Sequence, residues 1–463
     1  MRLDAYPAIA GSLESRILSS AILIEIPYHK HSSDLFAKIK HLDHAVWLDS
    51  CFPDGFKGRF DIMAAEPMEV FSGDDLSVLT KVRTAIKQHF PSTKSPDPDL
   101  PFIGGAIGFL SYDIGNASLT TDAVAKQTID FPKSCIGIYP WTIVQDHRRR
   151  RCLLVCAATM TEYDREQIKR HFMSTNTPRP QPAPKLGAPF KATISQDRYR
   201  QDFERIQAYL LAGDCYQVNY TQHFSTTFYN DPWQAYQVLR HTAKAPFSAF
   251  FKLPQGTIMS VSPERFIKLH GRHIETRPIK GTQARHHDPF IDTERAKKLC
   301  NSDKDKAENL MIVDLMRNDI GRLCVPGSVV VDKLFELETY SNVHHLVSTI
   351  EGELAAEFDA LDLLKACFPG GSITGAPKRR AMEIIQELEA TERSIYCGSM
   401  FYISADGAMD SSICIRTFLV ENETIHCWGG GGLVVDSEVD SEYQESIQKV
   451  ERFMQALEQS FSD

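Results

Sequence analysis

The sequence predicts a fold that mixes α-helices with β-strands, built either as two domains or as one large double-layered body. A chain of 463 residues is long enough to bury a large core. Segments that alternate apolar and polar residues, typical of strands, occur beside segments whose apolar residues recur at helical spacing. The contents of 43% hydrophobic and 24% charged residues are those of an ordinary globular protein.

Charge and cysteine content narrow the function classes. A net charge of -9 without a long basic block argues against nucleic acid or an anionic membrane as a partner. Apolar runs such as 21–26 are too short to span a bilayer, and the N-terminus lacks the layout of a signal peptide. Eleven cysteines without a C-x-x-C pair indicate reduced, mostly buried thiols, so we expect a cytoplasmic protein.

Composition divides the chain into three regions. Residues 1–173 mix strand-like and helical patterns, and their run FIGGAIGFL (102–110) lacks the glycine order of a dinucleotide site. Residues 174–190 hold prolines 178, 180, 182, 184 and 189 and predict an extended linker. Residues 191–458 have the more regular patterns and carry the candidate chemistry.

The first helix and strand after the linker are well marked. Ser195 is a cap for a helix that ends at Gly213. The apolar stripe of this helix consists of Tyr199, Phe203, Ile206 and Leu210. A strand over 215–224 follows, and strands are also predicted over 247–253 and 256–260. The strand over 215–224 carries an unusual polar face, made of Gln217, Asn219 and Thr221.

A carboxylate and an amine mark the segment SPERFIKLHGRHIETRPIKGT (262–282). Glu264 follows Ser-Pro, and Lys280 lies between an isoleucine and a Gly-Thr turn. In a partly apolar setting the pKa values of both groups move toward neutrality, as acid and nucleophile chemistry requires. The alternative is a hairpin in which the two side chains form a solvated ion pair.

Further charged groups lie on two predicted helices. Ser302 and Asp305 resemble a capping box for a helix through Asn318, which is apolar nearly all round and carries Glu308. A helix over 376–388 follows FPGGSITGAPK (368–378), whose Ala376 stands where a P-loop needs lysine. A phosphate-binding P-loop is therefore rejected.

The last helix, over 440–457, presents Glu442, Glu445 and Lys449 on one face. Before it, the glycines of WGGGG (428–432) let backbone approach another group closely. Two carboxylates here and Glu308 elsewhere would supply oxygen ligands for Mg²⁺. The alternative is a solvated helix face with one ion pair.

Together these segments resemble the chorismate-binding enzymes. The resemblance covers nearly all of residues 193–455. It rests on YQVNYTQ (216–222), SPERF (262–266), ETRPIKGT (275–282), KAENLMIVDLMRNDIGR (306–322), HHLVSTIEG (344–352), FPGGSITGAPK (368–378), GGGGL (429–433) and EYQES (442–446). Residues 1–172 resemble the family's N-terminal region more loosely, through WLDS (47–50) and RFDIMAAEP (59–67).

The resemblance implies a reaction. Family members that add water carry a lysine where this chain has Gln217, and members that form anthranilate carry an alanine where it has Lys280. The combination of Gln217 and Lys280, together with APFSAF (245–250), implies amination of chorismate at ring carbon 4. This reaction leads toward 4-aminobenzoate and folate. In that reaction Lys280 attacks ring carbon 2, Glu264 protonates the departing 4-hydroxyl, and ammonia enters at carbon 4.

The resemblance also implies binding sites. Glu308, Glu442 and Glu445 match the Mg²⁺ ligands, and Ser50 and Arg59 match a pocket that binds tryptophan in relatives. Substrate contacts are implied for Gln217, Thr282, His345, Tyr396, Arg416, Gly430, Gly431, Gly432 and Lys449. The implied fold is α+β, with two large antiparallel sheets packed as a sandwich and helices outside.

Nitrogen supply implies a partner. No cysteine lies in a strand–nucleophile–helix elbow that could attack an amide, so we expect a separate glutamine amidotransferase subunit to deliver ammonia. Two alternatives remain: an anthranilate-forming enzyme of the same family, against which Lys280 speaks, and a tryptophan-binding protein without catalysis.

Overall fold

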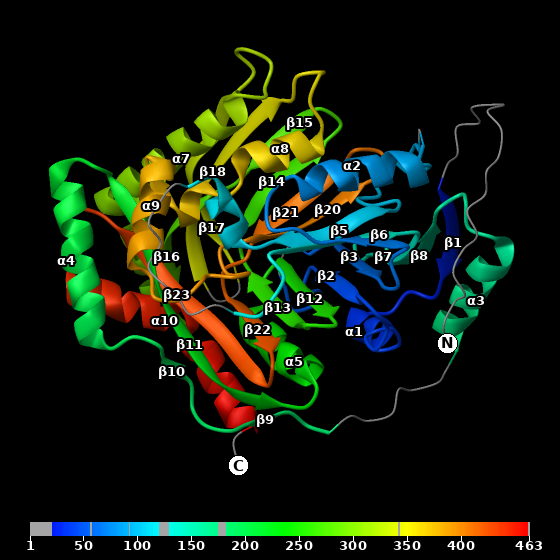
Figure 1. The fold of residues 1–463 in the computed structure, drawn as a ribbon, viewed down its shortest axis with the longest axis horizontal. Helices are drawn as coiled ribbons and strands as arrows, with labels where there is room; N and C mark the ends of the chain where they lie inside the picture. Colours follow the sequence, from blue (N-terminus) through cyan, green and yellow to red (C-terminus); the bar gives the residue numbers. More distant parts are fainter. Residues whose placement is uncertain are drawn as a thin grey trace.

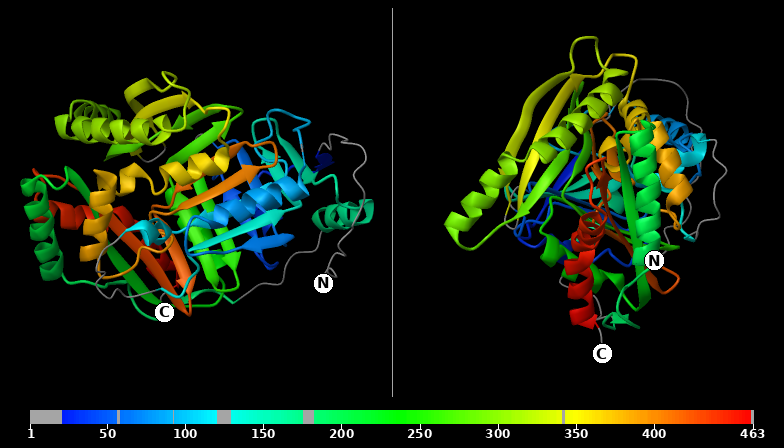
Figure 2. Two further views of the ribbon diagram at one scale, coloured as in Figure 1. Left: turned by 45° about the horizontal axis from the view of Figure 1, so that its top comes forward. Right: turned by 90° about the vertical axis from the view of Figure 1, so that its left-hand side faces the viewer.

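The computed structural model describes residues 21–55, 58–91, 93–119, 129–174, 182–340 and 343–461. Two large sheets of antiparallel strands pack face to face, and helices cover the outside (Figures 1 and 2). The predicted α+β sandwich is therefore confirmed. The central part of the predicted linker, residues 175–181, lies outside the described residues.

The first sheet has 13 strands. Ten register pairs between β11 and β23 form its longest ladder, in which the glycines of β23 face residues 219–222 of β11. Across this sheet the strands follow the order β1 (Ile22–Ile26), β8 (Arg151–Cys156), β7 (Trp141–Asp146), β3 (Phe60–Ala64), β2 (Val46–Asp49), β12 (Phe247–Leu253), β13 (Gly256–Ser262), β22 (Thr417–Glu421), β23 (Thr424–Leu433), β11 (Gln217–Tyr229) and β10 (Lys191–Ala192), with β9 (Lys185–Leu186) and β19 (Gly375–Ala376) also paired to β11.

The second sheet has 10 strands. Their order is β16 (Ile279–Ala284), β18 (Val343–Glu353), β15 (His273–Thr276), β14 (Arg265–His270), β21 (Met409–Ile413), β20 (Ser399–Ser404), β5 (Gly105–Leu110), β6 (Ser134–Tyr139) and β4 (Glu69–Phe71), with β17 (Val330–Thr339) paired to β18. Strands from before and after the linker share both sheets, because β2 pairs with β12 and β5 pairs with β20.

The helices lie around the sheets, and α10 packs on β23 and α5. They are α1 (Ser32–Phe36), α2 (Val78–His89), α3 (Glu162–Met173), α4 (Gln196–Ala212), α5 (Pro232–Ala243), α6 (Pro289–Cys300), α7 (Asp303–Gly321), α8 (Ala360–Cys367), α9 (Lys378–Leu388) and α10 (Val439–Phe461), with 3₁₀ turns η1 (Tyr112–Ser118) and η2 (Gly371–Ile373). The predicted caps of α4 are confirmed, since Ser195 accepts a hydrogen bond from the Arg198 amide and Gly213 adopts φ 80°.

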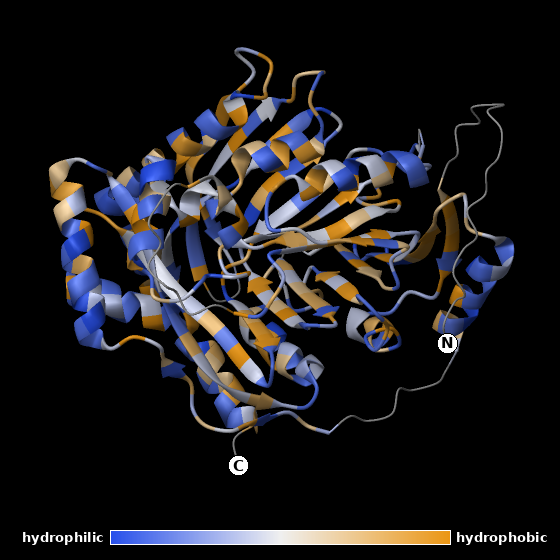
Figure 3. Cartoon of the chain, viewed as in Figure 1, coloured by the Kyte–Doolittle hydropathy of each residue, from blue (hydrophilic) through white to orange (hydrophobic). Residues whose placement is uncertain are grey.

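The core runs continuously between the two sheets. Apolar residues colour the central strands in Figure 3, whereas the outer helices are mostly hydrophilic. One cluster of buried side chains joins Trp47 and Trp428 of the first sheet to Phe109 and Ile350 of the second. In the described part of the chain, no helix is both long and apolar enough to cross a membrane. All eleven cysteines are free thiols.

Three element predictions needed correction. The strand predicted over 215–224 begins at Gln217 and continues to Tyr229, because β23 pairs with it from Val218 to Thr227 and β9 pairs with Phe228 and Tyr229. The helix predicted from Ala376 begins at Lys378, because Gly375 and Ala376 pair with β11. Helix α7 is not apolar all round, since Leu310 is 47% exposed while Ile312 and Val313 are buried.

Candidate active site

Glu264 lies where the chain crosses from one sheet to the other. Strand β13 of the first sheet ends at Ser262 and β14 of the second sheet begins at Arg265, so the carboxylate sits between the layers. The Glu264 backbone is fixed on both sides: its carbonyl accepts from the Ile413 amide at 3.1 Å and its amide donates to Ser262 Oγ at 3.2 Å. The position is therefore set by the crossing of two sheets.

Burial dominates the electrostatics of Glu264. Its side chain is buried, and desolvation raises its pKa to about 7, although a hydrogen bond from Ser372 and the charges of Lys280 and Arg416 act to lower it. Ser372 Oγ in η2 donates to Glu264 Oε1 at 2.8 Å. A carboxyl group with a pKa near neutrality can donate a proton at physiological pH. The alternative of a solvated hairpin pair is wrong for this residue.

Lys280 lies on an irregular part of β16. The pairing of β16 with β18 shifts register between Ile279 and Thr282, and Gly281 adopts φ 84°. A Cβ atom at Gly281 would lie 3.0 Å from Leu299 and 3.1 Å from the Asp305 carboxylate, so glycine lets the start of α7 approach closely. The irregular pairing therefore sets the local direction of the chain at Lys280.

The Lys280 amine carries a lowered pKa. Desolvation is the main cause and the Lys449 charge adds to it, while Glu308, Glu264 and Glu445 act in the opposite direction. A lowered pKa increases the neutral fraction of an amine at a given pH, and only the neutral form is a nucleophile. Since Lys280 and Glu264 each perturb the other, the structure brings the two predicted catalytic groups into one site.

The three predicted metal ligands gather beside Lys280. Glu442 and Glu445 come from the first two turns of α10, and Glu308 comes from α7. A Cβ atom at Gly431 would lie 3.4 Å from Glu442 Oε2 and 3.4 Å from Glu445 Oε1. Glu308 and Glu442 both approach Lys304, at 4.0 and 3.5 Å. The three carboxylates therefore come together from two helices, α7 and α10.

Glu308, Glu442 and Glu445 suit a divalent cation that is only partly enclosed by protein. No three His, Cys, Asp or Glu side chains among the described residues converge tightly enough to enclose a metal ion. Mg²⁺ takes one or two protein carboxylates and completes its shell with waters and substrate oxygens. Carboxylates spread along a wall fit that mode of binding, whereas they would not form an all-protein cage. Burial also raises the pKa of Glu308, so a nearby cation would favour its ionised form.

The glycine strip allows β23 to approach its neighbours. A Cβ atom at Gly430 would lie 2.5 Å from the Tyr220 carbonyl oxygen, and one at Gly432 would lie 2.0 Å from Gln217 Nε2. Lys449 Nζ donates to the Gly430 carbonyl at 2.8 Å and pairs with Glu445 at 2.7 Å. A side chain at Gly432 would therefore displace Gln217, and one at Gly430 would push β11 away.

Gln217 offers a free acceptor in this region. Its residue is buried, and its Oε1 has no hydrogen-bond partner within the described part of the chain. A buried acceptor without a partner costs free energy unless a ligand or water satisfies it. Gln217 therefore fits the predicted role of contacting a bound molecule.

Arg416 also lies at a crossing between the sheets, after β21 and before β22. Its backbone adopts φ 50°, and burial lowers its pKa to about 10, with a further contribution from the Arg452 charge. The Arg416 charge affects both Glu264 and His345, which places this cation beside the candidate acid. A guanidinium at this position can bind a carboxylate ligand.

Three further residues were predicted to contact the substrate. Thr282 and His345 pair across β16 and β18, and Thr282 Oγ1 lies 2.8 Å from His345 Nδ1. Burial lowers the pKa of His345 to about 3, so its imidazole is neutral at pH 7. Tyr396 is buried and stacks on Trp428 with ring centroids 5.9 Å apart.

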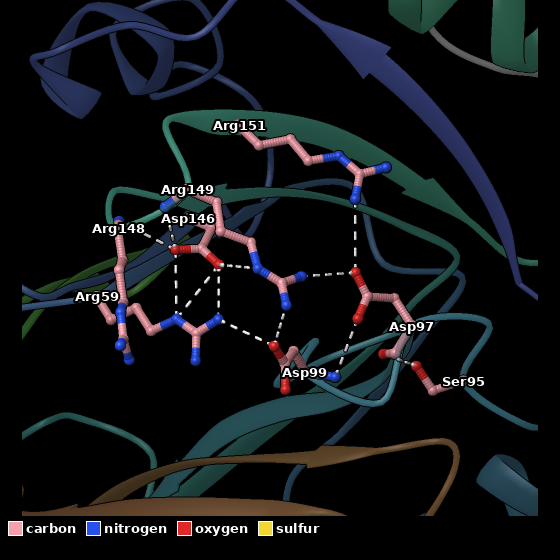
Figure 4. A network of polar contacts seen from close by, with 8 residues as sticks. All are labelled: Arg59, Ser95, Asp97, Asp99, Asp146, Arg148, Arg149 and Arg151. Atoms are coloured by element: carbon pink, nitrogen blue, oxygen red, sulfur yellow. Dashed lines mark hydrogen bonds and ion pairs between the residues drawn. The ribbon is translucent and has the colours of Figure 1, made fainter.

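The predicted tryptophan-binding residues border a different cavity. A cavity of about 560 Å³ lies between β2, β3 and β12 of one sheet and β14, β20 and β21 of the other, and Ser50 and Arg59 line it. Ser50 Oγ is buried without a partner among the described residues. Arg59 donates to Asp146 at 2.9 Å and to Asp99 at 3.4 Å, within the ion-pair network of Figure 4.

Two residues of the site were missed by the sequence reasoning. Ser372, which donates to Glu264, lies inside FPGGSITGAPK. The glycines of this segment suggested a P-loop, so its serine was not considered. Lys304 approaches Glu442 and Glu308. Its place four residues before Glu308, on the same helix face, was the available signal.

Ser372 provides a test of the acid. In Ser372→Ala the carboxylate loses a hydrogen bond that lowers the pKa of Glu264, so that pKa rises above about 7. Activity that needs the protonated acid then persists to higher pH, and we expect the falling limb of the pH–rate profile to move upward. A profile with an unchanged falling limb would assign that limb to another group.

The chain was compared with known proteins. The family of chorismate binding enzymes matches residues 43–455. Aminodeoxychorismate synthase component 1 of Salmonella typhimurium is 43% identical over 454 residues, covering 95% of this chain and 99% of the relative. The protein of the same name from Escherichia coli is 42% identical, covering 96% and 100%. Anthranilate synthase component 1 of Streptomyces coelicolor is 32% identical, covering 98% and 94%.

Solved structures agree on the fold. Anthranilate synthase component I from Streptococcus pneumoniae superposes with a TM-score of 0.76 at 30% identity, covering 86% of this chain and 93% of that one. MenF, the menaquinone-specific isochorismate synthase of Escherichia coli, has a TM-score of 0.73 at 16% identity, covering 94% of each chain.

Proposed function

The chain belongs to the family of chorismate binding enzymes, and from this premise we propose that it aminates chorismate at ring carbon 4 to give 4-amino-4-deoxychorismate. This is a transaminase-class reaction, that of an aminodeoxychorismate synthase component 1, in a cytoplasmic pathway toward 4-aminobenzoate and folate. The observation that carries the proposal is that Lys280 and Glu264 lie close enough for each charge to act on the other group, with desolvation lowering the pKa of the amine and raising that of the carboxyl.

The first half of the reaction uses both groups. Neutral Lys280 Nζ forms a bond to ring carbon 2, both ring double bonds shift along the ring toward carbon 4, and the bond from carbon 4 to its hydroxyl breaks. Glu264 gives its proton to the departing hydroxyl, which leaves as water. The enzyme then holds a covalent ammonium adduct at carbon 2 and an ionised Glu264, so atoms and charge balance.

The second half reverses the shift. Ammonia forms a bond to carbon 4, and the electron pair of the bond at carbon 2 returns to Lys280 as a neutral amine. The new ammonium group at carbon 4 returns a proton to Glu264, which restores both residues. The net change is chorismate plus ammonia to the amino product plus water.

The remaining groups orient a dianionic substrate. Arg416 lies beside Glu264, and Lys449 lies over the glycine strip, so two cations face the region where substrate carboxylates would bind. Glu308, Glu442 and Glu445 would hold Mg²⁺, which when bound supplies positive charge to a substrate carboxylate. Gln217, Thr282, His345 and Tyr396 supply hydrogen bonds and shape.

The second cavity supports a proposed regulatory or structural ligand. Its free Ser50 hydroxyl and adjacent Arg59 suit an amino acid such as tryptophan. Arg265, the residue after Glu264, also lines this cavity, so a ligand there would contact the same strand start as the acid.

Product identity and nitrogen source test the proposed function together. Ammonia is mostly protonated at neutral pH, and ammonium has no lone pair to attack carbon 4. We therefore expect the purified chain, given chorismate and Mg²⁺, to use ammonium best at raised pH and to leave glutamine unused. A glutamine amidotransferase subunit should add glutamine-dependent synthesis near pH 7. Chromatography identifies the product. Anthranilate would indicate an anthranilate-forming enzyme, and unchanged chorismate would indicate a protein that binds without catalysis.

A further inference from the structure

Three carboxylates and three lysines face one another in the pocket. Lys449 pairs with Glu445 at 2.7 Å, and Lys304 lies 3.5 Å from Glu442 Oε1 and 4.0 Å from Glu308 Oε1. Among the charged groups, Glu308 interacts most strongly with Lys280. When all six groups are ionised, their formal charges cancel. The pocket therefore supplies its own counter-charge for each carboxylate that we propose as a metal ligand.

Lys304 differs from the other two lysines. Lys280 is the proposed nucleophile, and Lys449 Nζ is anchored to the Gly430 carbonyl. Lys304 lies in the first turn of α7, and its side chain is 55% exposed. Its contacts with Glu442 and Glu308 are long, and an exposed lysine has several rotamers that lead to solvent. Of the three lysines, Lys304 is therefore the one whose side chain can turn toward solvent without disturbing the catalytic groups.

We propose that the Lys304 ammonium group neutralises Glu442 and Glu308 in the metal-free enzyme and moves away from them when a divalent cation binds. The inference rests on the proposed function, in which these carboxylates hold Mg²⁺. An ammonium group and a divalent cation within about 4 Å of the same oxygens repel each other strongly, so the two compete. Lys304 therefore sets the metal affinity of the site.

Two consequences distinguish this role from a structural one. Removing the Lys304 charge removes a competitor, so metal binding becomes tighter, by roughly threefold to tenfold for two ion pairs whose lysine is exposed. In the metal-free protein the same change removes a counter-charge from Glu442 and one of two from Glu308, so the melting temperature falls, and saturating metal restores it. A merely structural lysine would weaken metal binding when removed.

The test uses the purified full chain without substrate and Mn²⁺ as the probe, because Mn²⁺ accepts the same oxygen ligands and its free ion is measured by electron paramagnetic resonance. The variants are Lys304→Met and Lys304→Arg, with Lys306→Met as control. Lys306 is two residues away on α7 and so points to a different face. We expect a lower Kd for Lys304→Met and wild-type values for the other two.

Each outcome has a separate meaning. Mn²⁺ binding by Lys304→Met with an unchanged or higher Kd, or a metal-free melting temperature equal to wild type, overturns the role of Lys304 and leaves the proposed function standing. Failure of wild-type protein to bind Mn²⁺ would instead refute the metal site itself, and this inference with it. Lys304→Arg keeps the charge and supplies a folded reference if the methionine variant is unstable.

Discussion

Lys280→Ala should lower 4-amino-4-deoxychorismate formation by roughly 10³-fold or more, because the covalent step loses its nucleophile. The lysine is desolvated and interacts with Glu264 and Glu308, whereas Lys449 is tied to the Gly430 carbonyl and Lys304 is largely exposed. Residual turnover should shift toward direct amination at carbon 2, as alanine at this position accompanies anthranilate formation in the family. Product analysis by chromatography and mass spectrometry measures both effects.

Lys297→Ala is a suitable control for this variant. Lys297 is 64% exposed on α6 and pairs with Glu294, away from the candidate site. It should retain wild-type rates. Full retention of 4-amination by Lys280→Ala would rule out the covalent route. Capture of the adduct as a chorismate-derived mass increase on wild-type protein, absent from the variant, would support it independently of rate.

Glu264→Gln should lower the rate by about 10²- to 10⁴-fold, since the 4-hydroxyl loses its proton donor. The amide keeps the shape of the carboxyl and can still accept the Ser372 hydrogen bond, so the pocket should stay intact. In wild-type enzyme the protonated acid is lost as pH rises through about 7, which sets a falling limb of the pH–rate profile when the concentration of free ammonia is held constant. The variant's residual rate should lack that limb.

Stability gives a second readout for Glu264. Its folded pKa of about 7 lies above the ordinary value of 4.5, so the folded state holds this proton more tightly than the unfolded state. The resulting stability is fully present below 4.5 and is lost as pH rises through about 7. Glu264→Gln should therefore gain stability relative to wild type between pH 5 and 8, on the order of 3 kcal/mol. Parallel melting curves test this, and an equal pH response would show that Glu264 is solvated.

Local sequence determined the elements whose ends depend on nearby residues. Ser195 and Gly213 bound α4 because a side-chain cap and a left-handed glycine act within one turn of the helix. Ser302 likewise caps α7. The two-sheet sandwich and most of the candidate site residues followed from motifs that resemble a family, and a family resemblance carries tertiary information that spacing alone does not contain.

Tertiary structure decided what the local patterns left open. Glu264 and Arg416 lie near each other because each is placed where the chain crosses between the sheets. The two segments are about 150 residues apart, and no local periodicity encodes their contact. The extension of β11 and the late start of α9 depend on strand partners distant in sequence. The pKa of Glu264 is raised because packing around it excludes water, and that exclusion is a property of the assembled layers.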